Sequence, residues 1–250
     1  IKYIRARVDR VVVILPFESE IYHRAGVACT FVGHPLLDAV ASSYDRPGLR
    51  RQFHLSSEGR VVALLPGSRR AEVASLLPVL LDAAQRLRQD HPETQFILAQ
   101  ASTIPDALLQ PILKESAVPV TVVKEQASEV MAVSDVVLVA SGTATLQAAV
   151  VGTPMVLLYR TSRLVYTVGR LLIRVKWIGL VNLVAGRSVV PELIQHEATG
   201  ERLYQEARRL LEDRAAYDKM KAELAAVKAR LGEPGASRRA AQVVLDTCRA

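Results

Sequence analysis

Two kinds of apolar pattern divide the chain. Uninterrupted apolar runs recur at intervals of roughly 20 to 30 residues, and between them apolar residues return at three- and four-residue spacing. Uninterrupted runs are typical of strands in a parallel sheet covered on both faces, and the other spacing is typical of amphipathic helices. Their alternation predicts an α/β fold with a doubly wound parallel sheet. The predicted strands are 10–16, 28–32, 61–65, 95–99, 120–123, 136–140 and 155–159, and short helices are predicted at 17–25, 107–116, 128–133 and 143–152.

The longest helical pattern follows the strand at 61–65. Pro78 lies inside it and predicts a kink or a division into two abutting pieces, because proline cannot donate the helical hydrogen bond. The last stretch, 199–250, reads as charged amphipathic helices that we expect to pack across the sheet or against another domain. The apolar stripe of the long helix comprises Val73, Leu76, Leu77, Leu80, Ala84 and Leu87.

A linker composition at 42–48 suggests a domain boundary. We expect residues 1–48 to be the remnant of one Rossmann-like domain with its linker, and 49–250 to form a second. A strand–helix–strand unit cannot bury both faces of its sheet alone. Because the sequence also opens at Ile1, in the middle of a pattern, we expect the chain to be part of a longer protein.

The composition is that of a globular protein, since half of the 250 residues are hydrophobic and 23% are charged. The net charge of +7 favours anionic partners such as nucleotides, nucleic acid or acidic lipid. Aromatic residues make up only 5%, which argues against stacking on single-stranded nucleic acid. Cys29 and Cys248 are far apart, so the sequence indicates a reducing compartment without a disulfide framework. No apolar run reaches the length of about 20 residues that a membrane span needs.

No acidic residue occurs between Val136 and Pro191, although six basic residues do. Within this span, 164–184 is densely apolar, interrupted by basic side chains, and Trp177 lies near its end. Such a segment fits an interfacial helix in the lipid headgroup layer. It equally fits a core helix with snorkelling arginines, so both readings stay open.

Two strand-to-helix turns are candidates for phosphate binding. The first is Gly67-Ser68-Arg69, where glycine permits close backbone approach and Arg69 offers a guanidinium to a diphosphate. The second is Ser141–Ala144, followed after one helical turn by Gln147, whose amide could reach a ribose. The alternatives are a plain turn at the first position and a helix N-cap by Ser141 or Thr143 at the second.

A third candidate set, Asn182, Glu192 and Gln195, is polar and lies within apolar runs, which suggests a lined pocket. For Glu192 the alternative is a first-turn acid favoured by a helix dipole after Pro191. The histidines have no spacing for a metal site and are expected in loops or at the surface. The sequence contains no nucleotide-binding P-loop and no GxGxxG motif.

Four motifs, in this order, resemble the lipid-A-disaccharide synthases: LPFE…GVACTFVGHPLLD, LLPGSRRAEV, VASGTATLQAAVVGTPMVLLYR and GLVNLVAGRSVVPELIQ. The resemblance runs from about Arg10 to the C-terminus. It implies the GT-B architecture, in which two Rossmann-like domains face a cleft. By that architecture, 1–48 belongs to the acceptor-side domain and its linker, and 49–250 is the nucleotide-sugar-binding domain with its terminal helices.

The resemblance implies an inverting, metal-free glycosyltransferase without a cofactor. It would join UDP-2,3-diacylglucosamine to 2,3-diacylglucosamine 1-phosphate (lipid X), giving lipid A disaccharide and UDP. It further implies a peripheral position on the cytoplasmic face of the inner membrane, no nucleic-acid partner, and allows a homodimer. Two other interpretations stay open: another GT-B enzyme that uses UDP-sugars, and a basic module that binds a membrane surface or nucleic acid.

By position, the resemblance assigns Arg69 and Asn182 to catalysis and both turns to the diphosphate of the donor. Two departures matter. Family members commonly carry Glu where this chain has Gln147, so the affinity for the donor ribose is expected to be lower. Most of the acceptor-side domain, with its expected catalytic acid, is missing, so the chain is expected to bind donor but transfer sugar poorly. The residues expected to bind UDP-sugar are Gly67, Ser68, Arg69, Ser141, Gly142, Thr143, Ala144, Gln147, Asn182, Glu192 and Gln195.

Overall fold

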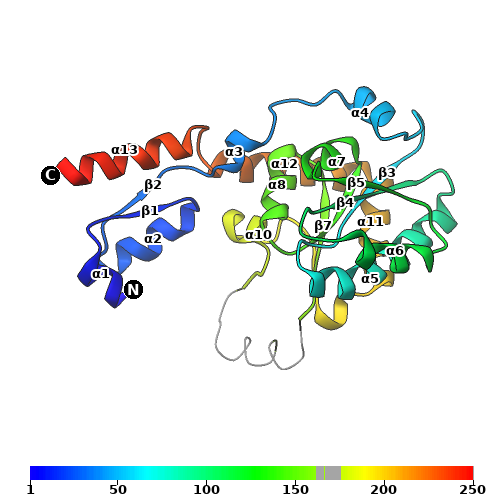
Figure 1. The fold of residues 1–250 in the computed structure, drawn as a ribbon, viewed down its shortest axis with the longest axis horizontal. Helices are drawn as coiled ribbons and strands as arrows, with labels where there is room; N and C mark the ends of the chain where they lie inside the picture. Colours follow the sequence, from blue (N-terminus) through cyan, green and yellow to red (C-terminus); the bar gives the residue numbers. More distant parts are fainter. Residues whose placement is uncertain (162–165, 167–175, 250) are drawn as a thin grey trace.

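The computed structural model describes residues 1–161, 166 and 176–249. They form two parallel sheets (Figure 1). The smaller sheet pairs β1 (Val11–Val13) with β2 (Cys29–Phe31) near the N-terminus. The larger sheet has six strands, and the main cluster of buried apolar residues is formed by these strands and the helices packed on them. The predicted α/β class is confirmed.

The larger sheet has the strand order β5-β4-β3-β6-β7-β8, with every pairing parallel. This is a doubly wound order that starts at β3 and reverses its direction between β3 and β6. Ligands of such sheets bind beyond the carboxyl ends of the strands at that reversal. The strands are β3 (Val61–Leu65), β4 (Gln95–Gln100), β5 (Val120–Lys124), β6 (Val136–Ala140), β7 (Met155–Tyr159) and β8 (Glu192–Ile194).

Helices cover both faces of this sheet, so β3 and β6 are buried along their whole length. On one face α5 contacts α6 and α11, and on the other α8 contacts α7, α10 and α12. This double cover explains why the strands are uninterrupted apolar runs. The helices are α5 (Arg70–Asp90), α6 (Asp106–Lys114), α7 (Ala127–Val133), α8 (Thr143–Val151), α10 (Leu180–Ala185), α11 (Gly200–Glu212) and α12 (Arg214–Arg230).

Helix α5 is a single helix that continues through Pro78, so the predicted division into two pieces does not occur. The residues flanking the proline explain this. Leu76, Leu77 and Leu80 are almost fully buried against the sheet and α11. Their packing outweighs the lost hydrogen bond of the proline, as tertiary context often does.

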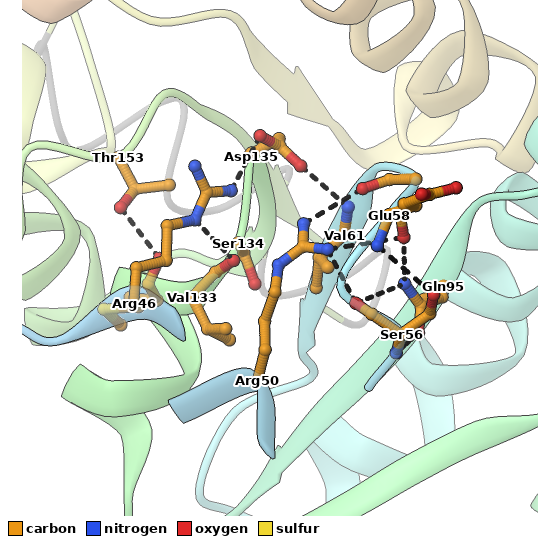
Figure 2. Close-up of polar contacts among 12 residues, drawn as sticks. Arg46, Arg50, Ser56, Glu58, Val61, Gln95, Val133, Ser134, Asp135 and Thr153 are labelled. Atoms are coloured by element: carbon orange, nitrogen blue, oxygen red, sulfur yellow. Dashed lines mark hydrogen bonds and ion pairs between the residues drawn. The ribbon is translucent and has the colours of Figure 1, made fainter. Parts of the chain in front are cut away.

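The amino edge of the larger sheet is held by a network of polar contacts (Figure 2). The Asp135 carboxylate accepts from the Val61 amide at 2.8 Å and from the Arg46 guanidinium at 2.7 Å. Arg46 begins the short helix α4 (Arg46–Gln52). One turn later, Arg50 donates to the carbonyls of Ser56, Glu58 and Gly59. Helix α4 is thereby fastened to the start of β3.

The C-terminal helix α13 (Ala236–Arg249) leaves the larger sheet and runs beside the N-terminal segment (Figure 1). The Asp38 carboxylate accepts from the Gly235 amide at 2.6 Å, and Arg239 donates to the Val32 carbonyl at 2.9 Å. The start of α13 is thus in contact with residues 32–38 of the N-terminal segment. The N-terminal segment also contains α1 (Lys2–Arg7), α2 (Pro16–Arg24) and α3 (Leu36–Ala39).

The segment expected at a membrane surface, 164–184, lies about half outside the described residues. Of its basic and aromatic residues, Tyr166, Lys176 and Trp177 are described, and the Lys176 ammonium lies 4.8 Å from the centre of the Trp177 ring. Within the described part of the chain, no helix is both long and apolar enough to cross a bilayer.

Candidate functional site

The first predicted turn connects β3 to α5 and depends on a glycine. Gly67 has φ +108°, a conformation that side-chain-bearing residues rarely adopt. A Cβ placed there would lie 2.5 Å from a carboxylate oxygen of Glu72. Arg69 is the N-cap residue of α5, and its guanidinium donates to Glu72 at 2.6 Å. Its side chain is 81% exposed, so it remains accessible to a ligand.

The second predicted turn connects β6 to α8. The Ser141 amide donates to the Leu158 carbonyl at 2.9 Å, which ties the turn to β7. Helix α8 begins at Thr143 with Gly142 as its N-cap, and no side chain of the described residues caps it. The alternative of a helix N-cap by Ser141 or Thr143 is therefore wrong. The open helix N-terminus keeps its positive end for another partner.

Gly142 contrasts with Gly67 in what surrounds it. A Cβ on Gly142 would meet no atom of the described residues within 4 Å. Internal packing therefore does not require a glycine there. Close approach of an external group to the backbone is a different reason for the absence of a side chain, and it fits a phosphate site.

Both turns open into one pocket of about 680 Å³, within the size range of small-molecule sites. They meet because β3 and β6 are neighbours, with Leu65 paired to Val139 at their carboxyl ends. The pocket therefore lies at the reversal of the strand order. Of the predicted residues, Gly67, Ser68, Arg69, Ser141, Gly142, Thr143, Ala144 and Gln147 line it.

The pocket also has walls that the motifs did not predict. They include Glu72, Gln100, Ser102 and Glu125. Three of these residues lie at or beyond the carboxyl ends of β4 and β5, so the strand pattern combined with the strand order could have found them. The walls are braced from outside, because the Thr103 hydroxyl donates to the Ser68 carbonyl at 2.6 Å.

Gln100 links the pocket wall to a charged pair on α6 and β5. Its amide donates to the Asp106 carboxylate at 2.7 Å, and Lys124 donates to the other oxygen at 2.8 Å. The hydrogen bond from Lys124, followed by that from Gln100, lowers the pKa of Asp106. Asp106 is therefore an ionised structural partner that holds Gln100 in place.

Gln147 lies one helical turn into α8 and faces the pocket. Its side-chain amide donates to the Ser128 hydroxyl at 2.7 Å, so its orientation is fixed by α7. The amide oxygen can still accept a hydrogen bond from a hydroxyl group. Charge in the pocket is mixed, since Arg69 faces two glutamates, Glu72 and Glu125. The main attraction for an anion is the pair of helix N-termini together with Arg69.

The third predicted set does not line this pocket. Asn182, Glu192 and Gln195 lie around β8 and α10 and hydrogen-bond to one another or to the backbone. Glu192 begins a strand, so the alternative of a first-turn acid in a helix after Pro191 is wrong. The assignment of the three residues to the donor stays a prediction.

No histidine of the described residues lines the pocket. Within its described residues, no group of three or more His, Cys, Asp or Glu side chains could hold a metal ion. His34 lies in a loop as expected, but it is buried. Its ring accepts a hydrogen bond from the Leu36 amide, and burial lowers its pKa while Glu18 opposes that shift.

Comparison with known sequences gives a consistent result. A family model described as lipid-A-disaccharide synthetase matches residues 1–246. The lipid-A-disaccharide synthase of Geobacter sulfurreducens is 47% identical over 246 residues, covering 98% of this chain and 64% of that protein. The one from Nitrosococcus oceani is 42% identical over 238 residues, covering 95% of this chain and 61% of that protein. The chain thus spans less than two thirds of these relatives.

Solved structures also include proteins with a similar fold. UDP-GlcNAc 2-epimerase from Neisseria meningitidis, bound to UDP-GlcNAc, has a TM-score of 0.66 at 13% identity, covering 95% of this chain and 62% of that one. WaaG, a glycosyltransferase involved in lipopolysaccharide biosynthesis, has a TM-score of 0.55 at 15% identity, covering 86% and 56%. At such identities the similarity concerns the fold.

Proposed function

Because the chain belongs to the lipid-A-disaccharide synthase family, we propose that it forms the donor-binding part of an inverting glycosyltransferase. The donor is UDP-2,3-diacylglucosamine, and the acceptor is 2,3-diacylglucosamine 1-phosphate. The products are lipid A disaccharide and UDP. The observation that carries the proposal is the single pocket shared by the turns at Gly67 and Gly142, with Arg69 at its mouth.

The pocket residues act on the leaving group. The acceptor hydroxyl oxygen forms a bond to the anomeric carbon of the donor sugar, while the bond from that carbon to the diphosphate oxygen breaks. The diphosphate takes the electron pair, and negative charge grows on it. Arg69 and the N-termini of α5 and α8 stabilise this charge, which removes the need for a metal ion in this step.

The hydroxyl proton of the acceptor requires a base. By the resemblance, this base is an acidic residue of the acceptor-side domain. Residues 1–48 are a remnant of that domain with its linker, and 49–250 form the donor domain. The separate two-stranded sheet at the N-terminus supports this division. Arg46, in the linker where α4 begins, donates to Asp135, so the linker ends against the donor domain. On this proposal the chain alone binds UDP but transfers sugar poorly.

The test is calorimetric titration of the chain with UDP. Binding at the micromolar to millimolar concentrations typical of nucleotide sites is expected, and no heat of binding from the folded chain would contradict the proposal. Comparing acylated with plain UDP-sugars then separates this function from that of other UDP-sugar enzymes. A preference for the acylated donor is expected.

The proposed location is the cytoplasmic face of the inner membrane, with lipid contact through basic residues. The acid-free span and the net charge of +7 support it. The test is co-flotation with vesicles of anionic lipid across a salt series. Binding that weakens as salt rises is expected for an electrostatic surface contact. Equal recovery with neutral and anionic vesicles would contradict it.

A further inference from the structure

The connection between β7 and α10 leaves the sheet at Thr161 and returns at Ile178. Strand β8 lies beside β7 at this point, with Tyr159 paired to Ile194. The residue that follows β8, Gln195, therefore lies beside the departing end. The residue that begins β8, Glu192, is paired to Leu157 and faces the returning end.

Gln195 holds the departing end by a two-way contact. Its side-chain oxygen accepts from the Thr161 amide at 2.7 Å, and its side-chain nitrogen donates to the Thr161 carbonyl at 3.0 Å. The side chain thus continues the ladder of the sheet beyond β8. Gln195 also has φ +54°, an uncommon conformation for a residue with a side chain. Such strain persists where surrounding contacts fix it, and it often marks a functional constraint.

Glu192 holds the returning end. Its two carboxylate oxygens accept from the amides of Ile178 at 2.9 Å and Gly179 at 3.0 Å. Gly179 is the N-cap residue of α10, so the carboxylate occupies a favourable helix N-terminus. The fit is close, because a Cβ on Gly179 would lie 2.4 Å from a methyl carbon of Leu157.

Asn182 lies in α10 and is fully buried. With Glu192 and Gln195 it forms a lock, meaning the set of hydrogen bonds that holds both ends of the connection. Its oxygen accepts from the amides of Val189 and Val190, and its nitrogen donates to the Val190 carbonyl and to Glu192 at 2.8 Å. These four contacts use the full hydrogen-bonding capacity of an asparagine side chain. The side chain has none left for a ligand.

We propose that Asn182, Glu192 and Gln195 are positioning residues that fix the two ends of the β7–α10 connection, and that they do not contact the donor. Gln195 also supports the pocket through the backbone of β7. The Leu158 carbonyl, in the strand that ends beside Gln195, accepts the Ser141 amide of the second turn. Fixing Thr161 therefore also fixes the strand that supports this turn.

The test is residue-resolved amide exchange by NMR, with UDP affinity measured in parallel. In the unmodified chain the amides of Thr161, Ile178 and Gly179 are expected to be protected. Glu192→Gln replaces an acceptor oxygen with an NH₂ group, and the Ile178 or Gly179 amide is expected to exchange about tenfold faster. UDP affinity is expected to stay within about twofold, because Glu192 does not line the pocket. Gln110→Ala, at an exposed site on α6, is the control.

Gln195→Glu gives a sharper readout, because it keeps the shape of the side chain. The carboxylate accepts from the Thr161 amide but repels its carbonyl, so faster exchange is expected at pH 7. Protonation restores a donor, and glutamate protonates at a pKa of about 4.3, or higher beside a carbonyl. Lowering the pH towards 5 should therefore restore protection relative to the intrinsic exchange rate.

Two results would overturn the positioning role. One is unchanged exchange at all three amides in both variants. The other is a tenfold loss of UDP affinity with unchanged exchange, which would make these residues donor ligands. If the unmodified chain fails to bind UDP, the proposed function fails, but the exchange measurements still decide whether this lock exists.

Discussion

An arginine lies at each edge of the larger sheet, and the two side chains have different roles. At the amino edge, Arg46 donates to Asp135, whose side chain is 11% exposed. At the carboxyl edge, the Arg69 side chain is 81% exposed and donates to Glu72 on its own helix. The charged groups at the amino edge thus bind each other within the fold, whereas Arg69 at the carboxyl edge remains accessible at a pocket.

The difference between the edges teaches how to separate stability from binding. A buried carboxylate with several donors contributes strongly to folding, and removing it leaves the partners unsatisfied. An exposed ion pair contributes little to folding because water screens it. Substitution of Asp135 at the amino edge should therefore change stability without changing UDP binding, and substitution of Arg69 at the carboxyl edge should do the reverse.

The largest effect is expected for Asp135→Ala. It removes the acceptor of the Val61 amide and leaves Arg46 without its carboxylate partner (Figure 2). We expect the free energy of unfolding, measured in urea, to fall by about 3 kcal/mol. Asp218→Ala breaks an exposed pair with Arg214 and should change it by less than about 0.5 kcal/mol. Equal losses in the two variants would remove the distinction between the edges.

Arg69→Ala should affect binding in place of stability. Losing a charge-assisted contact to the diphosphate is expected to weaken UDP about tenfold or more, by calorimetry. Unfolding in urea should change by less than about 0.5 kcal/mol, because the Glu72 pair is exposed on the arginine side. Arg202→Ala, an exposed site on α11, is the matched control for charge. A similar loss of affinity there would indicate only a general charge effect.

Gly142→Ala tests the backbone of the second turn. The new methyl group meets no described atom, so the melting temperature should hardly change. The methyl group would occupy space that a phosphate needs, and UDP affinity is expected to fall about tenfold. Gly67→Ala should instead lower both stability and affinity, because of its φ of +108° and its contact with Glu72. Full UDP affinity in Gly142→Ala would argue against phosphate binding at this turn.

Gln147→Glu should strengthen binding by a smaller factor. A carboxylate accepts hydrogen bonds from ribose hydroxyls about twice as strongly as an amide, so a severalfold gain in UDP affinity is expected. The contact with Ser128 survives if the hydroxyl becomes the donor. Titrating uridine in parallel checks that the gain belongs to the ribose. A gain for inorganic diphosphate instead would contradict this assignment.

The smallest effect is expected from pH, at His34 in the N-terminal segment. Burial lowers the pKa of His34 below its ordinary 6.5. The unfolded chain then binds a proton more readily, so this contribution to stability is present above pH 6.5 and is lost as the pH falls below it. His34→Gln should flatten the dependence of the urea midpoint on pH between 7 and 5. His196→Gln, at an exposed site, should leave the slope unchanged.

The local pattern predicted most elements within one or two residues. Strands β3, β6 and β7 have the predicted bounds, because fully buried strands leave uninterrupted apolar runs. Strand β8 was not predicted, since three residues at an edge leave no such run. Pro78 misled in the opposite direction, because its local cost is outweighed by the burial of its neighbours.

The candidate site divides in the same way. Both turns could be predicted, because a glycine-bearing bend between a strand and a helix is a local signal. Their meeting in one pocket depends on β3 and β6 being neighbours, although 70 residues lie between the end of β3 and the start of β6. Asp135 carried no local signal, because its partners Arg46 and Val61 come from distant segments.

The sequence by itself determined the alternation of strands and helices, the two turns and the family resemblance, since each is written in neighbouring residues. The tertiary structure alone decided which turns share a cavity and which polar residues are already satisfied. The residues that flank Asn182 in the sequence are the same whether its side chain binds a ligand or its own backbone, so the sequence does not distinguish the two. Only the folded chain assigns its four hydrogen bonds, because the path of the chain between α10 and β8 brings Val189, Val190 and Glu192 back to its side chain.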